Sequence, residues 1–283
     1  MNKLPMSKRV AIVSALVEGN SLRSTCRMTG VAMNTVLKLL AELGAACADL
    51  HNEKIRDVDA KRVECDEIWQ FIGAKAKNAT DEQKAAGWGD CWTWTAIDAD
   101  SKLIISYEIG ARNGFNCYEF MKDLASRLTG RVQLSTDGLR WYQDAVDRVF
   151  GIDIDFAQIV KTFGKVSVDP SAAVRYSPAT ITSSTKQVVV GDPDPKHIST
   201  SYVERQNLTM RMSMRRFTRL TNGFSKKIEN HMASVAIHFA HYNFCRVHKT
   251  LRVTPAMEAR LTDRVWSIED LIALLDKQSA KAA

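Results

Sequence analysis

The chain has 283 residues, a formal net charge of +7 and a pI near 9.1. This length accommodates a small module and one domain of up to about 200 residues, and the basic balance favours a polyanionic partner. No apolar run is long enough to span a bilayer, and the first residues lack a signal-peptide core, so a membrane protein is not expected. The six cysteines form no Cys-x-x-Cys pair, which argues against a zinc ribbon and indicates reduced thiols in a cytoplasmic protein.

The first part of the chain, residues 7–43, has the patterning of three helices. Gly19 stops the first helix, Ser21 can cap the second, Gly30 lies in the following turn, and the third is expected at 34–43. This is the pattern of a helix-turn-helix, whose last helix is free to enter a major groove; a plain three-helix bundle is the alternative. The candidate DNA contacts on this last helix are Asn34, Thr35 and Lys38.

The middle of the chain predicts a layered α/β domain. After a polar connection at 44–61, the pattern predicts strands at 63–72, 91–97 and 103–109, a helix at 115–128, a strand at 132–136, a helix at 139–150 and a strand at 152–159. Helices at 225–245 and 267–277 close the chain. The order βββαβαβ followed by helices is that of a ribonuclease H-like domain, with a mixed five-stranded sheet and flanking helices.

The expected domain division has four parts. They are a helix-turn-helix module at 1–46, a linker at 47–61, an α/β catalytic domain at 62–245 and a C-terminal helical extension at 246–283. The Ser-, Thr-, Val- and Pro-rich stretch at about 164–200 is expected to form a loop or small β insertion within the α/β domain.

Three acidic residues stand in unusual settings. Asp66 lies within an apolar strand, where an unpartnered carboxylate is costly, although Glu64 and Glu67 are rivals for its role. Asp137 precedes a glycine, which also suits a hairpin, but the helical pattern after it favours a strand-to-helix junction, where α/β ligand sites lie. Glu204 opens a helix, and a capping box with Ser201 is the alternative explanation.

Together these acids indicate a metal site. Two carboxylates on adjacent strands and one on a helix across from them can hold a pair of Mg²⁺ ions, which activate a nucleophile and stabilise the leaving oxygen at a phosphodiester. Between residues 205 and 227 every charged residue is basic, which indicates a polyanion. Arg211 follows Glu204 by two helical turns on the same face, and Arg215 is expected to continue that face.

A longer set of motifs resembles a known family. They are CDEIW at 65–69, TDG at 136–138, YVERQN at 202–207, FTRLTNGFSKK at 217–227 and HYNFCRVHKTLRVTPA at 241–256. Over nearly its whole length the chain resembles DDE transposases of the IS1 insertion-sequence group, which share the ribonuclease H-like fold of retroviral-type integrases. The interval between Asp137 and Glu204 is longer than in compact members of that family, as the insertion requires.

The resemblance implies a function and a site. It implies Mg²⁺-dependent cleavage at transposon ends and transfer of the 3′-OH into target DNA, with Asp66, Asp137 and Glu204 as catalytic metal ligands and Mn²⁺ as a possible substitute. The implied partners are terminal inverted repeats and target duplex DNA, bound by a homodimer or higher multimer in the bacterial nucleoid. The expected phosphate contacts are Arg205, Arg211, Arg215, Arg216, Lys226 and Lys227, and Arg246 and His248 are further expected DNA contacts.

Two other functions remain open from the sequence. A non-catalytic helix-turn-helix regulator would need the N-terminal helices but not the three acids. A tyrosine recombinase is suggested by the Arg and His residues at 246–252, but its His-x-x-Arg spacing is not met by His248 and Arg252. Such a recombinase would leave a covalent protein–DNA adduct.

Overall fold

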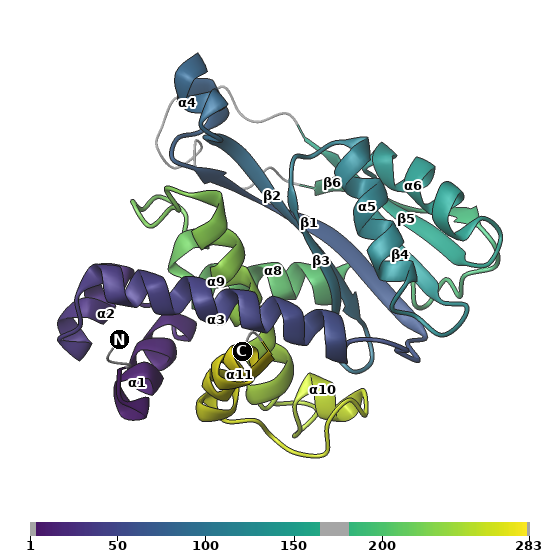
Figure 1. The fold of residues 1–283 in the computed structure, drawn as a ribbon. Coiled ribbons are helices and arrows are strands. Elements are labelled where there is room, and N and C mark those ends of the chain that lie inside the picture. The colour runs from purple at the N-terminus through teal and green to yellow at the C-terminus, as the bar shows by residue number, and fades with distance from the viewer. Residues whose placement is uncertain (1–3, 165–180, 282–283) are drawn as a thin grey trace.

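The computed structural model describes residues 4–164 and 181–281 of the chain. They form a mixed α/β architecture in which helices flank one sheet (Figure 1). The strands, in the sheet order β3-β2-β1-β4-β5-β6, are Ile104–Gly110, Gly89–Asp98, Arg62–Ile72, Gln133–Asp137, Asp155–Phe163 and Ile181–Val190. β4 is parallel to β1 and β5, and the other neighbouring strands are antiparallel. β1 and β4 therefore lie at the centre of the sheet.

The sheet has one strand more than the sequence predicted. The five expected strands are present, although β5 begins at Asp155 because residues 151–154 form a turn after the preceding helix. The expectation of five strands is wrong because β6, from the segment predicted as a loop or β insertion, pairs antiparallel with β5. The part of that insertion at 165–180 lies outside the described residues.

The N-terminal helices are α1 (Met6–Val17), α2 (Leu22–Thr29) and α3 (Met33–Lys54). The turn before α3 contains Gly30 in the left-handed conformation, with φ of 68°. α3 continues to Lys54, so the expected end near residue 43 is wrong. Its second half is buried along α9 (Ile228–Ala240), where a Cβ on Gly44 would collide with Ala233.

The remaining helices lie around the sheet and next to the N-terminal helices (Figure 1). They are α4 (Asp81–Ala85), α5 (Gly114–Ala125), α6 (Arg140–Phe150), α8 (Ser201–Ser213), α10 (Pro255–Glu258) and α11 (Ile268–Lys281), with short 3₁₀ turns η1 (Ala76–Asn78) and η2 (Arg215–Phe217). α5 and α6 pack on one face, where Trp94 of β2 contacts Phe120 and Tyr142 at ring-centroid distances of 6.1 and 5.7 Å. α8 and α9 pack on the other face through a cluster that includes Ile68 of β1.

The helix expected at 225–245 is divided. α9 ends at Ala240 and continues as a π-helical turn, η3 (His241–Cys245). Within it the Asn243 side chain pairs with the edge strand β3: its Oδ1 accepts from the Ile104 N–H and its Nδ2 donates to the Ile104 carbonyl, both at 3.0 Å. Asn243 thus satisfies backbone groups that an edge strand would otherwise leave unpaired.

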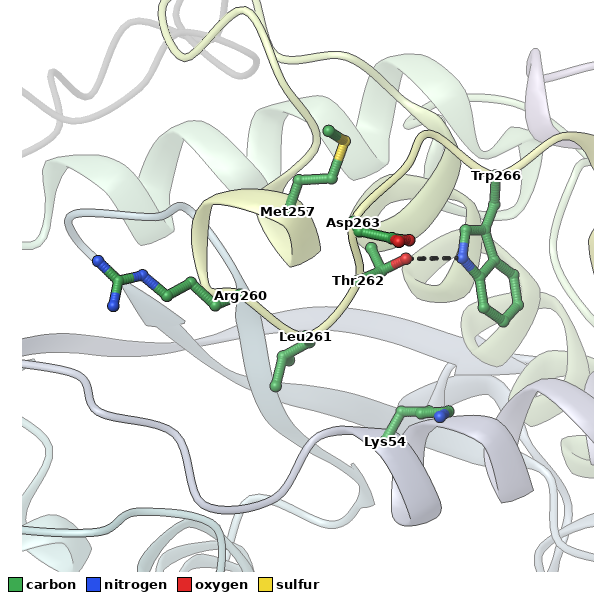
Figure 2. A pocket seen from close by; sticks show the side chains of 7 residues that line it. All are labelled: Lys54, Met257, Arg260, Leu261, Thr262, Asp263 and Trp266. Carbon is green, nitrogen blue, oxygen red and sulfur yellow. Dashed lines mark hydrogen bonds between the residues drawn. The ribbon is translucent and has the colours of Figure 1, made fainter.

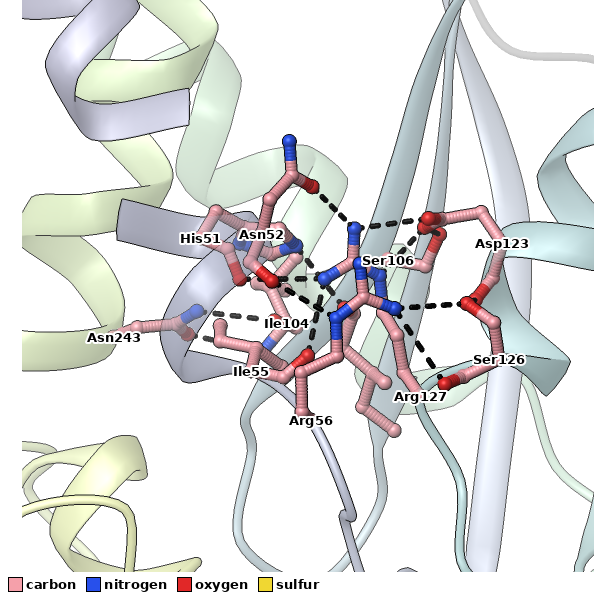
Figure 3. A network of polar contacts seen from close by, with 11 residues as sticks. His51, Asn52, Ile55, Arg56, Ile104, Ser106, Asp123, Ser126, Arg127 and Asn243 are labelled. Carbon is pink, nitrogen blue, oxygen red and sulfur yellow. Dashed lines mark hydrogen bonds and ion pairs between the residues drawn. The ribbon is translucent and has the colours of Figure 1, made fainter. Parts of the chain in front are cut away.

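A buried arginine joins α3 to α5 (Figure 3). Arg127 is 2% exposed, and its guanidinium donates to both oxygens of Asp123 at 2.7 and 2.9 Å. It also donates to the Ile55 carbonyl at 3.0 Å and to Oδ1 of Asn52 at 2.6 Å. The carbonyls at the end of a helix have no intrahelical partner, so Arg127 caps α3 and fixes it to the sheet domain.

No single described helix is long and apolar enough to cross a membrane. α2 and α3 pass the same test only as a pair, by length and composition, and their axes bend by 113° at the break between them.

Candidate active site

Asp66 and Asp137 lie beside each other in the centre of the sheet. The parallel pairing of β1 with β4 runs from Arg62 opposite Gln133 to Cys65 opposite Thr136, so the next position on each strand carries a carboxylate. Asp137 ends β4, and α6 begins three residues later, so the predicted strand-to-helix junction is confirmed. The two acids therefore meet at the carboxyl edge of β4, where α/β proteins place their ligand sites.

Asp66 is held on the face of the sheet covered by α8. Its Oδ1 accepts from the Glu67 N–H at 2.9 Å, and its Oδ2 accepts from Nδ2 of Asn207, on α8, at 2.8 Å. Burial raises the pKa of Asp66 to about 7, and the negative charges of Glu67, Asp137 and Glu204 act in the same direction. A cation bound between these carboxylates would relieve that repulsion.

Glu67 points to the opposite face, as strand alternation requires. Its side chain is 1% exposed, and it accepts hydrogen bonds from the Tyr142 hydroxyl at 3.2 Å and from Arg112 at 2.6 Å. Even so, one carboxylate oxygen from each of Asp66, Glu67 and Asp137 lies within 4.8 Å of the others. Burial raises the pKa of Glu67, with a further increase from Asp137 and an opposing effect of Arg112.

Asp137 has both cationic and anionic neighbours. Its Oδ1 accepts from the Leu139 N–H at 3.0 Å, and its Oδ2 lies 3.8 Å from Nη2 of Arg112. Burial raises the pKa of Asp137; the Leu139 N–H, Arg112 and Lys161 oppose this increase, and Glu204 adds to it.

Glu204 lies close enough to the two aspartates for its charge to act on them, but it is not within the 4.8 Å group of described acids. Its Oε1 accepts from the Thr200 hydroxyl at 2.8 Å and forms an ion pair with Lys161 of β5. Its charge raises the pKa of both Asp66 and Asp137, so the three carboxylates share one electrostatic environment. Lys161 neutralises Glu204 in this state.

The capping box considered for Glu204 is absent, because another acid performs that role. Glu64 is 3% exposed, and its Oε2 accepts from the backbone N–H groups of Tyr202 and Val203 at 2.7 and 3.1 Å. A carboxylate at this position satisfies two unpaired donors of α8 and complements the helix dipole. Because Glu64 has this capping role, it is excluded as a rival of Asp66. The side chain of Glu204 is 46% exposed.

The predicted cationic contacts fall into separate groups. Arg211 is half-buried close enough to Asp66 and Arg219 for both charges to act on its pKa, which burial lowers. Arg205, Arg246 and Lys102 together lower the pKa of His248, after a larger effect of burial. Lys226 and Lys227 are exposed immediately before α9.

Two predicted phosphate contacts are placed differently from expectation. Arg215 lies in η2, after α8 has ended at Ser213, so it does not continue the Arg211 face of that helix. Arg216 turns inward, where its Nη1 donates to the Ser225 hydroxyl at 2.7 Å and burial lowers its pKa to about 10. The local charge run gave no indication of this inward rotation.

The three predicted contacts of the N-terminal module are all exposed. Asn34, Thr35 and Lys38 lie in the first turns of α3, and Lys38 pairs with Glu42 at 3.7 Å. The Ser21 hydroxyl accepts from the Ser24 N–H at 3.0 Å, so the predicted cap of α2 is confirmed.

The donor groups suit a hard divalent cation. Carboxylate and amide oxygens are the protein ligands that Mg²⁺ accepts, and the site offers them from Asp66, Asp137 and Glu204. Asn207 adds a further observation. It is only 9% exposed, yet its Oδ1 has no hydrogen-bond partner among the described residues. An orphaned buried oxygen next to Asp66 fits a site that gains a cation or a water held by one.

Sequence reasoning missed Arg112 and Asn207 and treated Glu67 only as a rival of Asp66. Asn207 had a usable signal, because it follows Glu204 by three residues and so lies on the same helical face. Arg112 had none, since it lies between β3 and α5 and reaches Asp137 only through the fold.

A hollow of about 520 Å³ has none of Asp66, Asp137 and Glu204 in its lining, which Figure 2 shows. It is formed by the end of α3, α10 and the segment that follows α10. Trp266 lines it and donates from Nε1 to the Thr262 hydroxyl at 3.1 Å. The hollow is therefore separate from the candidate metal site.

Comparison with known proteins gives partial likenesses to solved structures. No protein-family model and no curated protein matches the chain. A piggyBac transposase, solved as a synaptic complex with hairpin DNA, matches with a TM-score of 0.42 and 10% identity over 98% of this chain and 73% of its own. The Mos1 transposase, in a paired-end complex with the left transposon end, matches with a TM-score of 0.23 and 14% identity over 55% of this chain and 60% of its own. Neither TM-score reaches 0.5, so the function must be argued from the site itself.

Proposed function

We propose that the chain is a DDE transposase, related to the IS1 group, that cuts phosphodiester bonds at transposon ends and joins the freed 3′-OH to target DNA. The observation that carries this proposal is the juxtaposition of Asp66 and Asp137 on neighbouring parallel strands, with Glu204 of α8 near enough to raise the pKa of both. Basic residues near these acids favour the binding of a polyanionic substrate.

The order of the elements supports a ribonuclease H-like catalytic domain. Three strands, a helix, a strand, a helix and a further strand follow one another along the chain, and the strand bearing Asp66 is central. β6 is an addition at the edge of this arrangement.

Asp66 and Asp137 would hold the metal ions, with Glu204 as the third ligand once Lys161 releases it. Two Mg²⁺ ions, or Mn²⁺ in their place, supply activation of the attacking oxygen and stabilisation of the leaving oxygen. The protein residues position the DNA: Arg205, Arg211, Arg246 and His248 bind backbone phosphates near α8. In the first step, an oxygen of water bonds to phosphorus as the bond to the 3′ oxygen breaks, and the 3′ oxygen takes up a proton. In the second step, that 3′-OH displaces a 3′ oxygen of the target.

The N-terminal helices would recognise the transposon ends. α2 and α3 meet at 113° across a turn that contains Gly30, a geometry found in helix-turn-helix motifs. Asn34, Thr35 and Lys38 are exposed at the start of α3, where a recognition helix contacts base edges. Bringing two ends together would require a dimer or a larger multimer acting on cytoplasmic DNA.

Cleavage assays on duplexes from the DNA that flanks the gene test this function. We expect Asp137→Asn and Glu204→Gln to lower Mg²⁺-dependent cleavage at least about a hundredfold, because each removes a metal ligand. Affinity for the same duplex, measured by fluorescence anisotropy, should change little, because neither residue contacts a phosphate. Glu229→Gln is the matched control, since Glu229 is an exposed acid in the first turn of α9.

The assay also separates the alternatives. A chain that binds terminal DNA selectively but cuts nothing with Mg²⁺ or Mn²⁺ would be the non-catalytic regulator that the N-terminal helices alone could support. A protein–DNA adduct on a denaturing gel would indicate a recombinase with a covalent intermediate. If Asp137→Asn cleaved the duplex at the wild-type rate, the proposed catalytic site would be wrong.

A further inference from the structure

Arg112 enters the carboxylate site from the face opposite α8. It lies between β3 and α5. Its Nε donates to Oε1 of Glu67 at 2.6 Å, and its Nη2 forms an ion pair with the same oxygen at 2.6 Å. Nη2 is also 3.8 Å from Oδ2 of Asp137. The guanidinium carbon lies 5.0 Å from the centre of the Trp92 ring. The hydrogen bond, the ion pair and the cation–π contact together fix its plane.

The support beneath Arg112 is buried, whereas Arg112 itself is accessible. The Glu67 side chain is 1% exposed, and its second oxygen accepts from Tyr142, which is fully buried. By contrast, 39% of the Arg112 side chain is exposed. Nη1 has no hydrogen bond among the described residues. The ion pair with Glu67 therefore leaves a donor open on a guanidinium whose Nη2 lies 3.8 Å from Oδ2 of Asp137.

We propose, on the basis of the transposase function above, that Arg112 binds a non-bridging oxygen of the scissile phosphate and stabilises its charge in the transition state. A phosphate seated between Asp66 and Asp137 places its oxygens next to a guanidinium that is already 3.8 Å from Asp137. The guanidinium fork matches phosphate geometry, and a donor fixed in advance needs no reorganisation during the reaction. Glu67 is the positioning residue that holds this fork.

This role balances the charges around the phosphate. Arg211 and Lys161 act on Asp66 and Asp137 from the side of α8 and β5. Arg112 supplies positive charge from the side of α5, where Glu67 accepts hydrogen bonds from it and from Tyr142. Two-sided placement stabilises charge on more than one phosphate oxygen.

The test uses duplexes whose mapped scissile phosphate carries sulfur at either non-bridging position. Wild type should prefer one phosphorothioate diastereomer. Arg112→Ala should lower kcat about a hundredfold with little change in KM, and the preference for that diastereomer should fall towards one. Arg112→Lys should lie between the two, because lysine keeps the charge but not the fork. Arg148→Ala, at an exposed arginine near the end of α6, is the control of equal charge and should behave as wild type.

A second measurement is independent of turnover. Removing the Arg112 charge should tighten Mn²⁺ binding to the metal-free protein in a calorimetric titration, because a cation next to Asp137 is lost. Since Arg112→Ala leaves Glu67 buried without its partner, Glu67→Gln/Arg112→Ala is made as well. It removes the unpaired charge, and we expect it to fold and to retain the loss of diastereomer preference.

The possible outcomes are distinct. If Arg112→Ala and the double variant keep the wild-type rate and diastereomer preference while Asp137→Asn is inactive, Arg112 does not touch the phosphate, although the transposase function stands. Unchanged preference with tighter Mn²⁺ binding would mean that Arg112 is only a counter-ion. If wild type cuts no duplex with either metal, the proposed function is overturned and this role with it.

Discussion

At the residue scale, the site is dominated by repulsion between carboxylates. Asp66, Glu67 and Asp137 each have a pKa raised by burial, and neighbouring carboxylates add to each increase. Arg112 and Lys161 offset this repulsion only in part. The fold therefore holds close together carboxylates that would be more stable if they were apart and hydrated. This pattern is common at functional sites.

This repulsion predicts a pH dependence of stability in the absence of metal. The pKa of Asp66 is raised from 3.8 to about 7, so its contribution to stability is fully present below about pH 4 and is lost as the pH rises through about 7. We expect the free energy of unfolding in EDTA to fall by on the order of a few kcal/mol between pH 5 and pH 8. Asp66→Asn should flatten this dependence.

Urea unfolding at four pH values measures the effect, with Glu229→Gln as the control acid. Added Mg²⁺ should stabilise wild type more at pH 8 than at pH 5, because binding requires the deprotonated carboxylates. If the free energy of unfolding changed with pH in the same way in wild type and in Asp66→Asn, Asp66 would not be the group that causes the pH dependence.

At the element scale, contacts between distant residues decide where the helices begin and end. Glu64 of β1 caps α8, which leaves Glu204 free of the capping role. Arg127, two residues after the end of α5, binds carbonyls at the end of α3 (Figure 3). Each contact orients a helix that carries proposed functional residues.

The Arg127 contact predicts a specific loss of stability. Arg127→Met should lower the free energy of unfolding by about 3 kcal/mol, because it leaves Asp123 and the carbonyls of α3 without their hydrogen-bond donor. Arg127→Lys should cost less, since it keeps the charge. Chemical denaturation followed by circular dichroism and by tryptophan fluorescence measures both. A change of less than about 0.5 kcal/mol for Arg127→Met would contradict the structural role.

At the scale of the whole molecule, DNA binding should divide between two regions. Arg211→Ala should weaken binding to cognate and unrelated duplexes about equally and reduce the salt slope by roughly one unit, because it removes one phosphate contact. Asn34→Ala and Lys38→Ala should mainly reduce the preference for terminal repeats, since base edges carry the sequence code.

Competition binding at two salt concentrations tests this division. Arg148→Ala again serves as the charge control. The opposite pattern, in which Arg211→Ala loses sequence preference while the α3 variants keep it, would show that α8 reads bases.

The sequence by itself determined the order of the first five strands and of the two helices, α5 and α6, between them. Strand alternation placed Asp66 and Glu67 on opposite faces of β1, and the change from strand to helical period placed Asp137 at a junction. These features follow from local periodicity, which depends only on residues that are neighbours in the chain.

Only the tertiary structure decided the rest. α3 extends to Lys54 because residues such as Leu50 are buried in the core, although the surrounding sequence is polar. Arg216 turns inward, and Arg112 reaches Asp137, through contacts with residues remote in the chain. Burial and pairing depend on which surfaces the fold brings together, and no local pattern of charge or hydrophobicity specifies those neighbours.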